Sequence, residues 1–315
     1  MGDVHAFRSS RLDLGLSQAT VAKRAGLSLR ALRNIETGKS SPRRGSAERI
    51  LRALRTELPD PPLWIGVLGP LKVRRGADRV ELTSASRRNL LGFLALHYDR
   101  VVTSSDLADV LWPGRPPSSW RNLIHVHINR LRAVLEPHRR PRIPSATITS
   151  TGGGYQMIVD ENSLDLARFV KLTDLGRAAA ASRDHALAQR HFEQALACWR
   201  GPVLADSGDA ITQRATASSL HHHRLSIALA YADLALAAGK FEQVGLLLKE
   251  IAEVEPWHER VHALLMRALA GNGQQAAAIG VYHRLAGRLA TELGVDPGPA
   301  LRQAYLATLQ PAAAG

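Results

Sequence analysis

The side chains best suited to recognition chemistry lie along residues 116–135, PPSSWRNLIHVHINRLRAVL. The apolar residues of this segment recur at helical spacing, which predicts an amphipathic helix over 118–135 with one face in a core. The opposite face carries cationic and amide side chains, namely Arg121, Asn122, His125, Asn129, Arg130 and Arg132. Arginine pairs with the guanine edge and asparagine with the adenine edge in the major groove of DNA. A helix with such a face has the shape and charge to enter that groove.

A second segment with similar side chains covers residues 16–38 and predicts two short helices joined by a tight turn at Gly26. Ser17 and Ser28 each precede one of the helices, where a hydroxyl can accept a hydrogen bond from an unpaired N–H group. The predicted helices cover 18–25 and 29–36. Two short helices in this arrangement form a helix-turn-helix, and its candidate DNA-contacting residues are Gln18, Ser28, Arg30, Arg33 and Asn34.

From Gln18 through Ile35-Glu36-x-Gly38 to Pro42, this segment resembles the phage-repressor (XRE-like) type of helix-turn-helix. The resemblance implies that Gln18 contacts a backbone phosphate and that residues 28–34 face the bases. The alternative is a helical hairpin that only supports the next domain, since such domains also serve as dimerisation or interaction modules.

The elements around the first recognition segment follow a mixed order. Short β-like runs with Gly-containing turns occupy 63–82, and three helical patterns follow at 86–98, 104–111 and 118–135. Residues 147–159, TITSTGGGYQMIV, predict a hairpin with a glycine turn. Such a hairpin after a recognition helix would form a wing over the DNA backbone or minor groove.

The chain from about residue 162 onward is helical in pattern and rich in Ala and Leu. Gly239 and Gly273 lie 34 residues apart, each between two helical stretches, and this distance is the tetratricopeptide period. Stacked helix pairs of this kind bury each other's apolar faces and present a curved surface that binds protein or peptide. A plain helical bundle is the alternative.

Charge divides the chain in the same way. The 315 residues carry a formal net charge of +13, yet residues 1–150 hold 26 Lys and Arg against 12 Asp and Glu. The remainder holds 15 against 16, so the whole excess lies in the first half. Such a split indicates that one part meets a polyanion, whereas the other part serves a different purpose.

Several protein classes are excluded by the same sequence. No apolar run reaches the roughly 18–20 residues that cross a bilayer, and the first residues form no signal peptide. Cys198 is the single cysteine, so a disulfide framework within the chain is impossible. His221–His223 cannot form one chelating face, because consecutive helical residues point in different directions. We therefore expect a cytoplasmic, nucleoid-associated protein with no metal, no cofactor and no enzymatic activity.

Ordered motifs recur between residues 68 and 297, and the resemblance that they carry spans about 63–310. They are Leu68-Gly69-Pro70-Leu71, Leu111-Trp112-Pro113, His127-Ile128-x-Arg130-Leu131-Arg132, Gly153-Gly154-Tyr155, Leu164-Asp165-x-x-Arg168-Phe169, Ala195-Leu196-x-x-Trp199-Arg200-Gly201-Pro202, Glu259-Arg260, Leu265-Met266-x-Ala268-Leu269 and Glu292-Leu293-Gly294-Val295-Asp296-Pro297. With these motifs the chain resembles the Streptomyces antibiotic regulatory protein family, in which a response-regulator type (OmpR-like) winged helix precedes a bacterial transcriptional activator domain. The resemblance implies that Arg88 lies near a phosphate and that the wing, with Thr151 and Tyr155, completes the DNA-contacting set.

The predicted fold is therefore mainly α with a small β component. It combines a helix-turn-helix bundle (1–58), an OmpR-like winged helix (63–159) and an all-α, tetratricopeptide-like activator domain (162–310). Pro61 and Pro62 mark a linker at 57–62, because proline lacks an N–H group and restricts the residue before it.

The resemblance implies a transcriptional activator that binds direct repeats in double-stranded DNA at promoters. It also implies recruitment of RNA polymerase holoenzyme through its sigma factor and other subunits, at secondary-metabolite (antibiotic) genes. A homodimer on DNA is one arrangement that fits. The alternative is a ligand- or peptide-responsive repressor that binds DNA through the N-terminal helix-turn-helix and senses its effector with the helical repeat.

Overall fold

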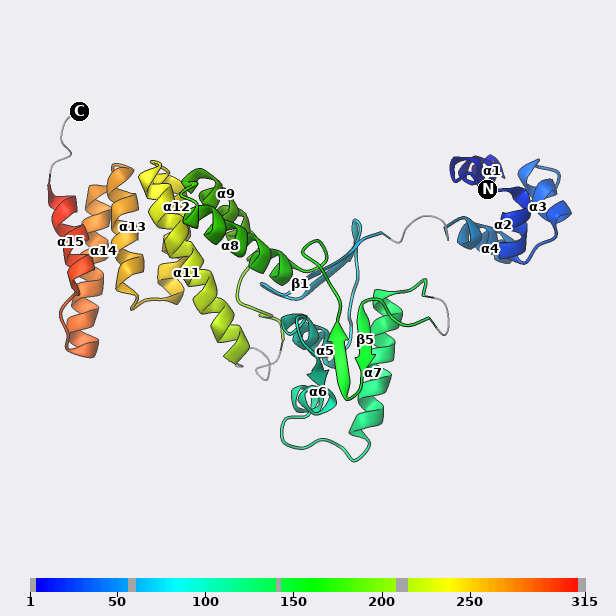
Figure 1. The fold of residues 1–315 in the computed structure, drawn as a ribbon, viewed down its shortest axis with the longest axis horizontal. Helices are drawn as coiled ribbons and strands as arrows, with labels where there is room; N and C mark the ends of the chain where they lie inside the picture. Colours follow the sequence, from blue (N-terminus) through cyan, green and yellow to red (C-terminus); the bar gives the residue numbers. More distant parts are fainter. Residues whose placement is uncertain (1–3, 56–60, 140–142, 208–214, 311–315) are drawn as a thin grey trace. The chain divides into compact units, whose positions relative to one another are not determined.

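Figure 1 shows the computed structural model of the protein, which describes residues 4–55, 61–139, 143–207 and 215–310. The chain divides into two compact units. The first comprises residues up to 62 with the segment 136–143, and the second comprises 63–135 and the chain from 144 onward. Helices dominate both units and the strands are short, which confirms the predicted fold class.

The first unit is a small helical bundle, whose described helices are α1 (Val4–Asp13), α2 (Gln18–Ala25), α3 (Leu29–Glu36) and α4 (Arg44–Arg55). Both predicted caps are confirmed. The Ser17 hydroxyl accepts a hydrogen bond from the Thr20 N–H group, and the Ser28 hydroxyl accepts one from the Ala31 N–H group, each at 3.1 Å. The helices enclose a core of their own, which includes Val21, Leu32 and Ile50.

The second unit begins with the winged helix. Its antiparallel first sheet comprises β1 (Leu63–Gly66), β2 (Lys72–Arg75) and β3 (Asp78–Arg79). Three helices follow, which are α5 (Ala85–Leu96), α6 (Ser104–Leu111) and α7 (Trp120–Leu135). The second sheet has the order β4-β6-β5, from β4 (Val102–Thr103), β6 (Gly154–Met157) and β5 (Ile148–Thr151). β5 and β6 form the predicted hairpin, in which Thr151 pairs with Gly154.

The strand predicted at the end of the first sheet is shorter than its apolar pattern suggested. β3 ends at Arg79, and Val80 still donates a hydrogen bond to the Val73 carbonyl oxygen at 2.9 Å. Leu82 is then buried in the core, so the chain leaves the sheet and continues toward α5.

The helical repeat makes up the rest of the second unit. Its described elements are α8 (Asp165–Ala181), α9 (His185–Leu196), α11 (Ala215–Ala237), α12 (Phe241–Val254), α13 (Glu259–Gly271), α14 (Gln275–Arg288), the π-helical turn η1 (Leu289–Leu293) and α15 (Pro299–Leu309). Figure 1 shows these helices side by side along the domain. The predicted tetratricopeptide-like arrangement is confirmed.

The turns that join the two helices of each pair contain the same backbone hydrogen bond. Gly239 and Gly273 have φ values of 74° and 73°, left-handed conformations that glycine adopts without steric cost. In each turn the next residue's N–H group returns to a carbonyl oxygen five residues earlier. These bonds are Lys240 to Ala235 at 2.9 Å and Gln274 to Leu269 at 2.8 Å. The α8–α9 turn uses the same bond, from Asp184 to Ala179 at 3.0 Å, with Arg183 in the glycine position. The pattern is the Schellman ending of a helix.

Close packing within a helix pair gives a first prediction. A Cβ atom added at Gly176 of α8 would lie less than 3.0 Å from the ring of Phe192 in α9. We expect Gly176→Val to destabilise the second unit by about 1–3 kcal/mol, because the ring has to be displaced within a packed core. The matched control is Gly287→Val in α14, where an added Cβ meets no atom within 4 Å. Thermal unfolding should show a lower Tm for the first variant and a nearly unchanged Tm for the second.

Candidate nucleic-acid interface

The helix α7 has one buried face and one exposed face. Its buried residues are Ile124, Ile128, Leu131 and Leu135. Five of the six predicted recognition residues are exposed on the other side, namely Arg121, Asn122, His125, Asn129 and Arg130. The helix therefore presents cationic and amide side chains to solvent while its apolar stripe anchors it in the core. This is the arrangement that entry into a major groove requires.

The sixth residue, Arg132, is half-buried and bound to the wing. Its Nε atom donates to the Ile148 carbonyl oxygen at 3.0 Å, and its Nη2 atom donates to the Ser150 hydroxyl at 2.8 Å. Its Nη1 atom donates to Oδ1 of Asn129 at 3.3 Å. These contacts tie β5 to α7 and orient the Asn129 amide. We therefore interpret Arg132 as a positioning residue, whose guanidinium is committed within the protein.

Tyr155 of β6 also connects the wing to α7. Only 2% of its surface is exposed, and its hydroxyl lies 2.6 Å from Nδ1 of His125. Arg132 lies over the Tyr155 ring, with its guanidinium carbon 5.9 Å from the ring centre. Tyr155 thus supports His125 from beneath rather than facing outward. Thr151 is exposed at the end of β5, next to the glycine turn of the wing.

At the start of α7, Arg121 stacks on Trp120. The guanidinium carbon lies 4.4 Å from the indole centre, within the range of a cation–π contact. Trp120 itself packs against the core. The stack holds the long Arg121 side chain at the protein surface, so less conformational freedom remains to be lost on binding.

Cationic side chains from α5 and α7 lie close to each other. Burial, followed by the charges of Arg130 and Arg87, lowers the pKa of His127. His127 is therefore neutral at physiological pH, and the local positive charge belongs to the arginines.

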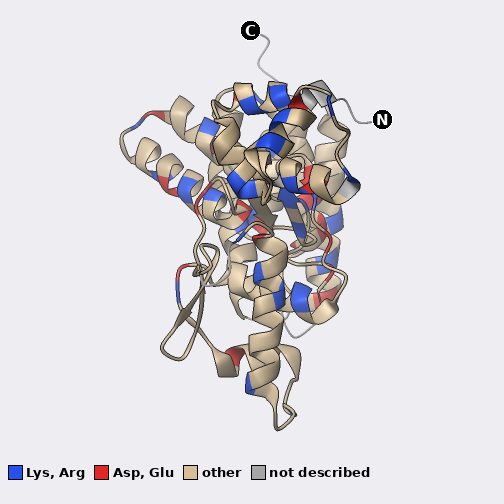
Figure 2. Ribbon diagram, turned by 90° about the vertical axis from the view of Figure 1, so that its right-hand side faces the viewer, with Lys and Arg blue, Asp and Glu red and all other residues tan. Residues whose placement is uncertain are grey.

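Arg88 is half-buried at the start of α5 and donates to the Leu82 carbonyl oxygen at 3.1 Å. Blue Lys and Arg positions recur along the helices in Figure 2 and outnumber the red acidic ones, as the net charge of +13 requires.

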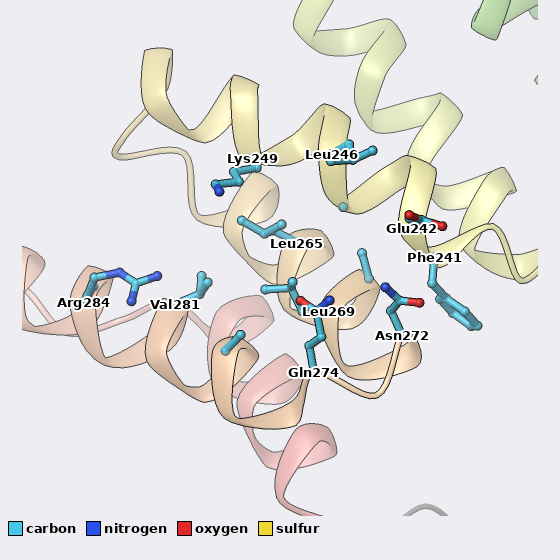
Figure 3. A pocket seen from close by; sticks show the side chains of 13 residues that line it. Phe241, Glu242, Leu246, Lys249, Leu265, Leu269, Asn272, Gln274, Val281 and Arg284 are labelled. Carbon is cyan, nitrogen blue, oxygen red and sulfur yellow. The ribbon is translucent and has the colours of Figure 1, made fainter.

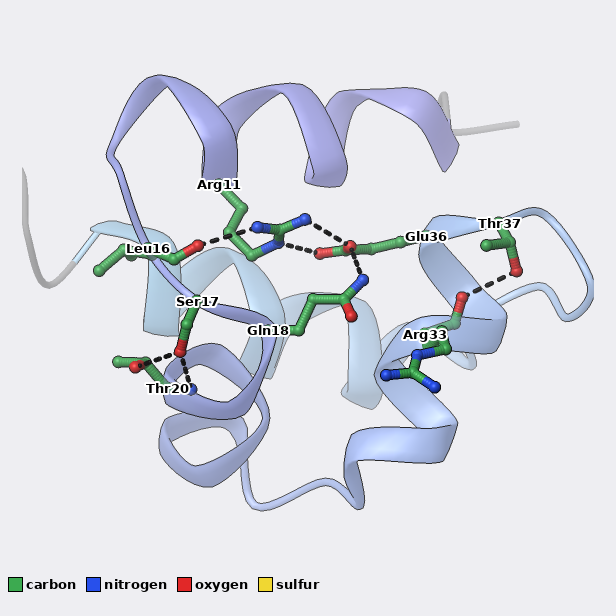
Figure 4. A network of polar contacts seen from close by, with 8 residues as sticks. All are labelled: Arg11, Leu16, Ser17, Gln18, Thr20, Arg33, Glu36 and Thr37. Carbon is green, nitrogen blue, oxygen red and sulfur yellow. Dashed lines mark hydrogen bonds and ion pairs between the residues drawn. The ribbon is translucent and has the colours of Figure 1, made fainter.

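The first unit is built around a buried ion pair (Figure 4). Arg11 of α1 donates to both carboxylate oxygens of Glu36 in α3, at 2.7 and 3.0 Å, and also to the Leu16 carbonyl oxygen at 2.8 Å. Gln18, the first residue of α2, donates from Nε2 to Glu36 at 2.8 Å. The predicted phosphate-contacting amide thus has its NH2 group held by Glu36. This contact fixes the start of α2 against the end of α3.

The other candidates of this unit lie on α3. Arg30 and Arg33 are exposed, whereas Asn34 is half-buried. The Ser28 hydroxyl is engaged as the cap of the helix. Leu29 is also exposed, at the position after the cap.

The first unit should become less stable at acidic pH. Burial opposes ionisation of Glu36, but hydrogen bonds from Arg11 and Gln18 outweigh it and hold its pKa below the ordinary value of 4.5. A lowered folded-state pKa gives stability that is complete above the unfolded pKa and is lost as the pH falls through the folded one. The protection factors of residues 4–36 against hydrogen exchange, which are corrected for the intrinsic pH dependence of the amide rate, should therefore fall below a pH of about 4.5. In Glu36→Gln this dependence should vanish and exchange should be faster at neutral pH, whereas Asp13→Asn, an exposed position, should behave as the parent.

The winged helix and the helical repeat meet at Asp165, the first residue of α8. Its carboxylate, with 3% of the residue exposed, accepts hydrogen bonds from the N–H groups of Val67 and Leu68 at 2.8 and 3.0 Å. Arg200 donates to the same carboxylate at 3.0 Å and also to the Pro70 carbonyl oxygen at 3.0 Å. Burial raises the pKa of Asp165, against these donors, which lower it. Three sequence motifs that lie far apart in the chain thus form one joint.

Further hydrogen bonds connect the winged helix and the helical repeat at this joint. The Leu71 N–H group donates to Oδ1 of Asp206 at 2.7 Å, and the Leu204 N–H group donates to the Val67 and Gly69 carbonyl oxygens at 3.1 and 2.9 Å. The Leu204 side chain lies against Gly92 of α5. The helical repeat is therefore attached to the body that carries α7.

No metal centre emerges within the part of the chain that the structure describes. No group of three His, Cys, Asp or Glu side chains there could hold a metal ion. Burial raises the pKa of the Cys198 thiol to about 11, so the thiol stays protonated at neutral pH. None of the helices in the described residues is long and apolar enough to span a membrane.

Three protein families match consecutive parts of the chain. The family described as "Helix-turn-helix" matches residues 7–60, "Transcriptional regulatory protein, C terminal" matches 77–157, and "Bacterial transcriptional activator domain" matches 164–309. The protein is thus a DNA-binding transcriptional regulator with a helix-turn-helix, a winged helix and an all-α activator domain.

Individual relatives agree with these matches. Transcriptional regulatory protein MoaR1 of Mycobacterium tuberculosis is 32% identical over 76% of each chain. Transcriptional regulator RedD of Streptomyces coelicolor is 32% identical over 76% of this chain and 69% of its own. Regulatory protein AfsR of the same organism is 35% identical over 79% of this chain but only 24% of its own length. The structure of M. tuberculosis EmbR in complex with a low affinity phosphopeptide aligns at a TM-score of 0.68 and 32% identity, over 79% of this chain and 66% of that one. The chain belongs to the Streptomyces antibiotic regulatory protein family of transcriptional regulators.

Proposed function

We propose that this regulator activates transcription by binding short direct repeats near promoters through α7 and its wing. The observation that carries the proposal is the exposed row of Arg121, Asn122, Asn129 and Arg130 on a helix whose other face is buried. Arginine and asparagine read guanine and adenine edges, so this row suits direct readout. Arg132, Tyr155 and His125 hold the helix against the wing, and Arg88 and Thr151 contact the DNA backbone.

The first unit supplies a second contact with DNA. Arg30, Arg33 and Asn34 on α3 face bases, while Gln18 and Ser28 lie at helix N-termini, where backbone phosphates bind well. The proposed domains are 1–58, 63–159 and 162–310, with a linker at 57–62. Two DNA-binding modules on one chain raise the overall affinity, because binding of the first makes binding of the second intramolecular.

The helical repeat recruits RNA polymerase holoenzyme through its sigma factor and other subunits. Support comes from the joint at Asp165, which attaches the repeat to the winged helix, and from the charge of the second half of the chain, which lacks the cationic excess of the first. Direct repeats place two copies of the protein in tandem, so a homodimer forms on DNA. The regulated genes belong to secondary metabolism, as in antibiotic biosynthesis. In vitro transcription with purified holoenzyme, on a promoter that the protein binds, tests this step, and an unchanged transcript level would contradict it.

Binding to DNA should depend steeply on salt. Each phosphate neutralised by the protein releases counterions, so the logarithm of the association constant falls by roughly 0.9 per logarithmic unit of salt for each such contact. Fluorescence anisotropy with a duplex, measured across a series of salt concentrations, should therefore give a slope of several units. Replacement of a phosphate-contacting arginine should reduce that slope by about one. A flat titration would contradict an electrostatic DNA interface.

A further inference from the structure

A groove opens between α12, α13 and α14 in the helical repeat, and none of its lining residues belongs to α7 (Figure 3). Its volume is about 410 Å³. On each helix the lining residues recur at helical spacing, so that they share one face. They are Glu242, Leu246 and Lys249 on α12, Leu265 and Leu269 on α13, and Ala277, Val281 and Arg284 on α14.

Small residues line the groove where α12 packs against α13. Gly245 of α12 lies opposite Ala268 of α13, and an added Cβ at Gly245 would lie 3.8 Å from the Ala268 methyl group. Leu265 and Val281 are buried in the core and form an apolar floor. Leu246, by contrast, is 68% exposed at the edge of the groove. An apolar floor with an uncovered leucine at its rim is typical of a binding groove.

The two ends of the groove differ in charge, as Figure 3 shows. Lys249 and Arg284 lie at one end, and Glu242 lies at the other, near Phe241. Both cations are exposed, and no acidic side chain among the described residues pairs with either. The amides of Asn272 and Gln274 lie along the wall. Such amides can bond the backbone of an extended or helical peptide, which duplex DNA does not offer.

We propose that this groove binds a short peptide segment of a protein partner that combines apolar and acidic side chains. Its apolar side chains cover Leu246 and the floor, and its carboxylates pair with Lys249 and Arg284. Glu242 at the far end disfavours a second acidic cluster there and so fixes the direction of the peptide. None of the residues that line the groove belongs to α7. The peptide-binding proposal therefore does not depend on the promoter-binding proposal.

Fluorescence anisotropy with the full chain tests this site. The probes are fluorescein-labelled 12-residue peptides that combine Leu or Phe with Asp or Glu, and a matched set with Lys in place of each acid. We expect binding by members of the acidic set and none by the lysine set. In Lys249→Glu/Arg284→Glu the acidic peptides should bind at least about tenfold more weakly, and lysine peptides should bind instead, since charge reversal exchanges the favoured partner.

A steric pair of variants separates the groove from the rest of the helix. Ala277→Phe places a ring in the groove and should abolish peptide binding, whereas Ala276→Phe, one residue away and outside the lining, should leave it intact. Both alanines are exposed, so neither variant should alter folding. DNA affinity should be unchanged in both alanine variants and nearly parental in Lys249→Glu/Arg284→Glu, whose change in net charge has only a small long-range effect that salt screens. The proposal is overturned if no acidic peptide binds, if the groove variants bind as the parent does, or if duplex DNA displaces the peptides.

Discussion

Arg121→Glu/Arg130→Glu should remove sequence-specific DNA binding, with a loss of at least about a hundredfold in affinity. Each arginine that contacts a base edge contributes roughly 1–3 kcal/mol of discrimination, and reversal of its charge adds repulsion from the phosphates. Both side chains are exposed on α7, so the fold should persist. Anisotropy with a selected duplex measures the loss, and circular dichroism confirms that the helices remain.

Net charge has to be controlled in this experiment, because the substitution changes it by four units. Arg190→Glu/Arg302→Glu makes the same change at exposed positions of α9 and α15 in the helical repeat. We expect this variant to bind DNA with nearly parental affinity, apart from a small long-range effect that salt screens. Equal losses in the two double variants would mean that α7 contributes only general charge, which would contradict base readout by this helix.

Asp165→Ala should destabilise the second unit by about 3–5 kcal/mol. Removal of one partner of a buried ion pair leaves Arg200 uncompensated, and the N–H groups of Val67 and Leu68 lose their acceptor. Because this carboxylate joins the winged helix to the helical repeat, the loss should be large and should reach both parts. Urea unfolding followed by circular dichroism measures it.

The control for this substitution is Asp174→Ala. Its carboxylate also faces an arginine, Arg177, but at 3.9 Å and with 67% of the side chain exposed. Exposed pairs of this kind contribute about 0–1 kcal/mol, so the unfolding midpoint should hardly move. If Asp165→Ala were as harmless as Asp174→Ala, the joint would not hold the two parts together.

Local signals in the sequence predicted the elements well. The serines at positions 17 and 28, the apolar stripe of α7 and the glycines at 239 and 273 each act within one or two helical turns. Their effect can therefore be deduced from spacing alone. The structure confirms both caps, the amphipathic helix and the repeated turns.

Contacts between distant segments could not be predicted in this way. The helical pattern places Arg132 among the DNA-facing residues and the family resemblance adds Tyr155, yet in the structure Arg132 donates to β5 and Tyr155 is buried. Gln18 likewise donates to Glu36, which lies 18 residues away. The joint at Asp165 spans nearly 100 residues of chain, and no local spacing in the sequence predicts it. Partner choice over such distances depends on the packed structure rather than on spacing.

Selection of DNA from a pool of random duplexes by the full chain tests whether α7 recognises short direct repeats. We predict that the enriched sequences contain short direct repeats, and that Arg121→Glu/Arg130→Glu abolishes the enrichment. In Arg30→Ala/Arg33→Ala the repeats should still be selected, with any loss confined to flanking positions. Enrichment of an inverted repeat that depends on Arg30 and Arg33 but not on α7 would contradict the account, and it would favour a repressor that binds DNA through its first unit.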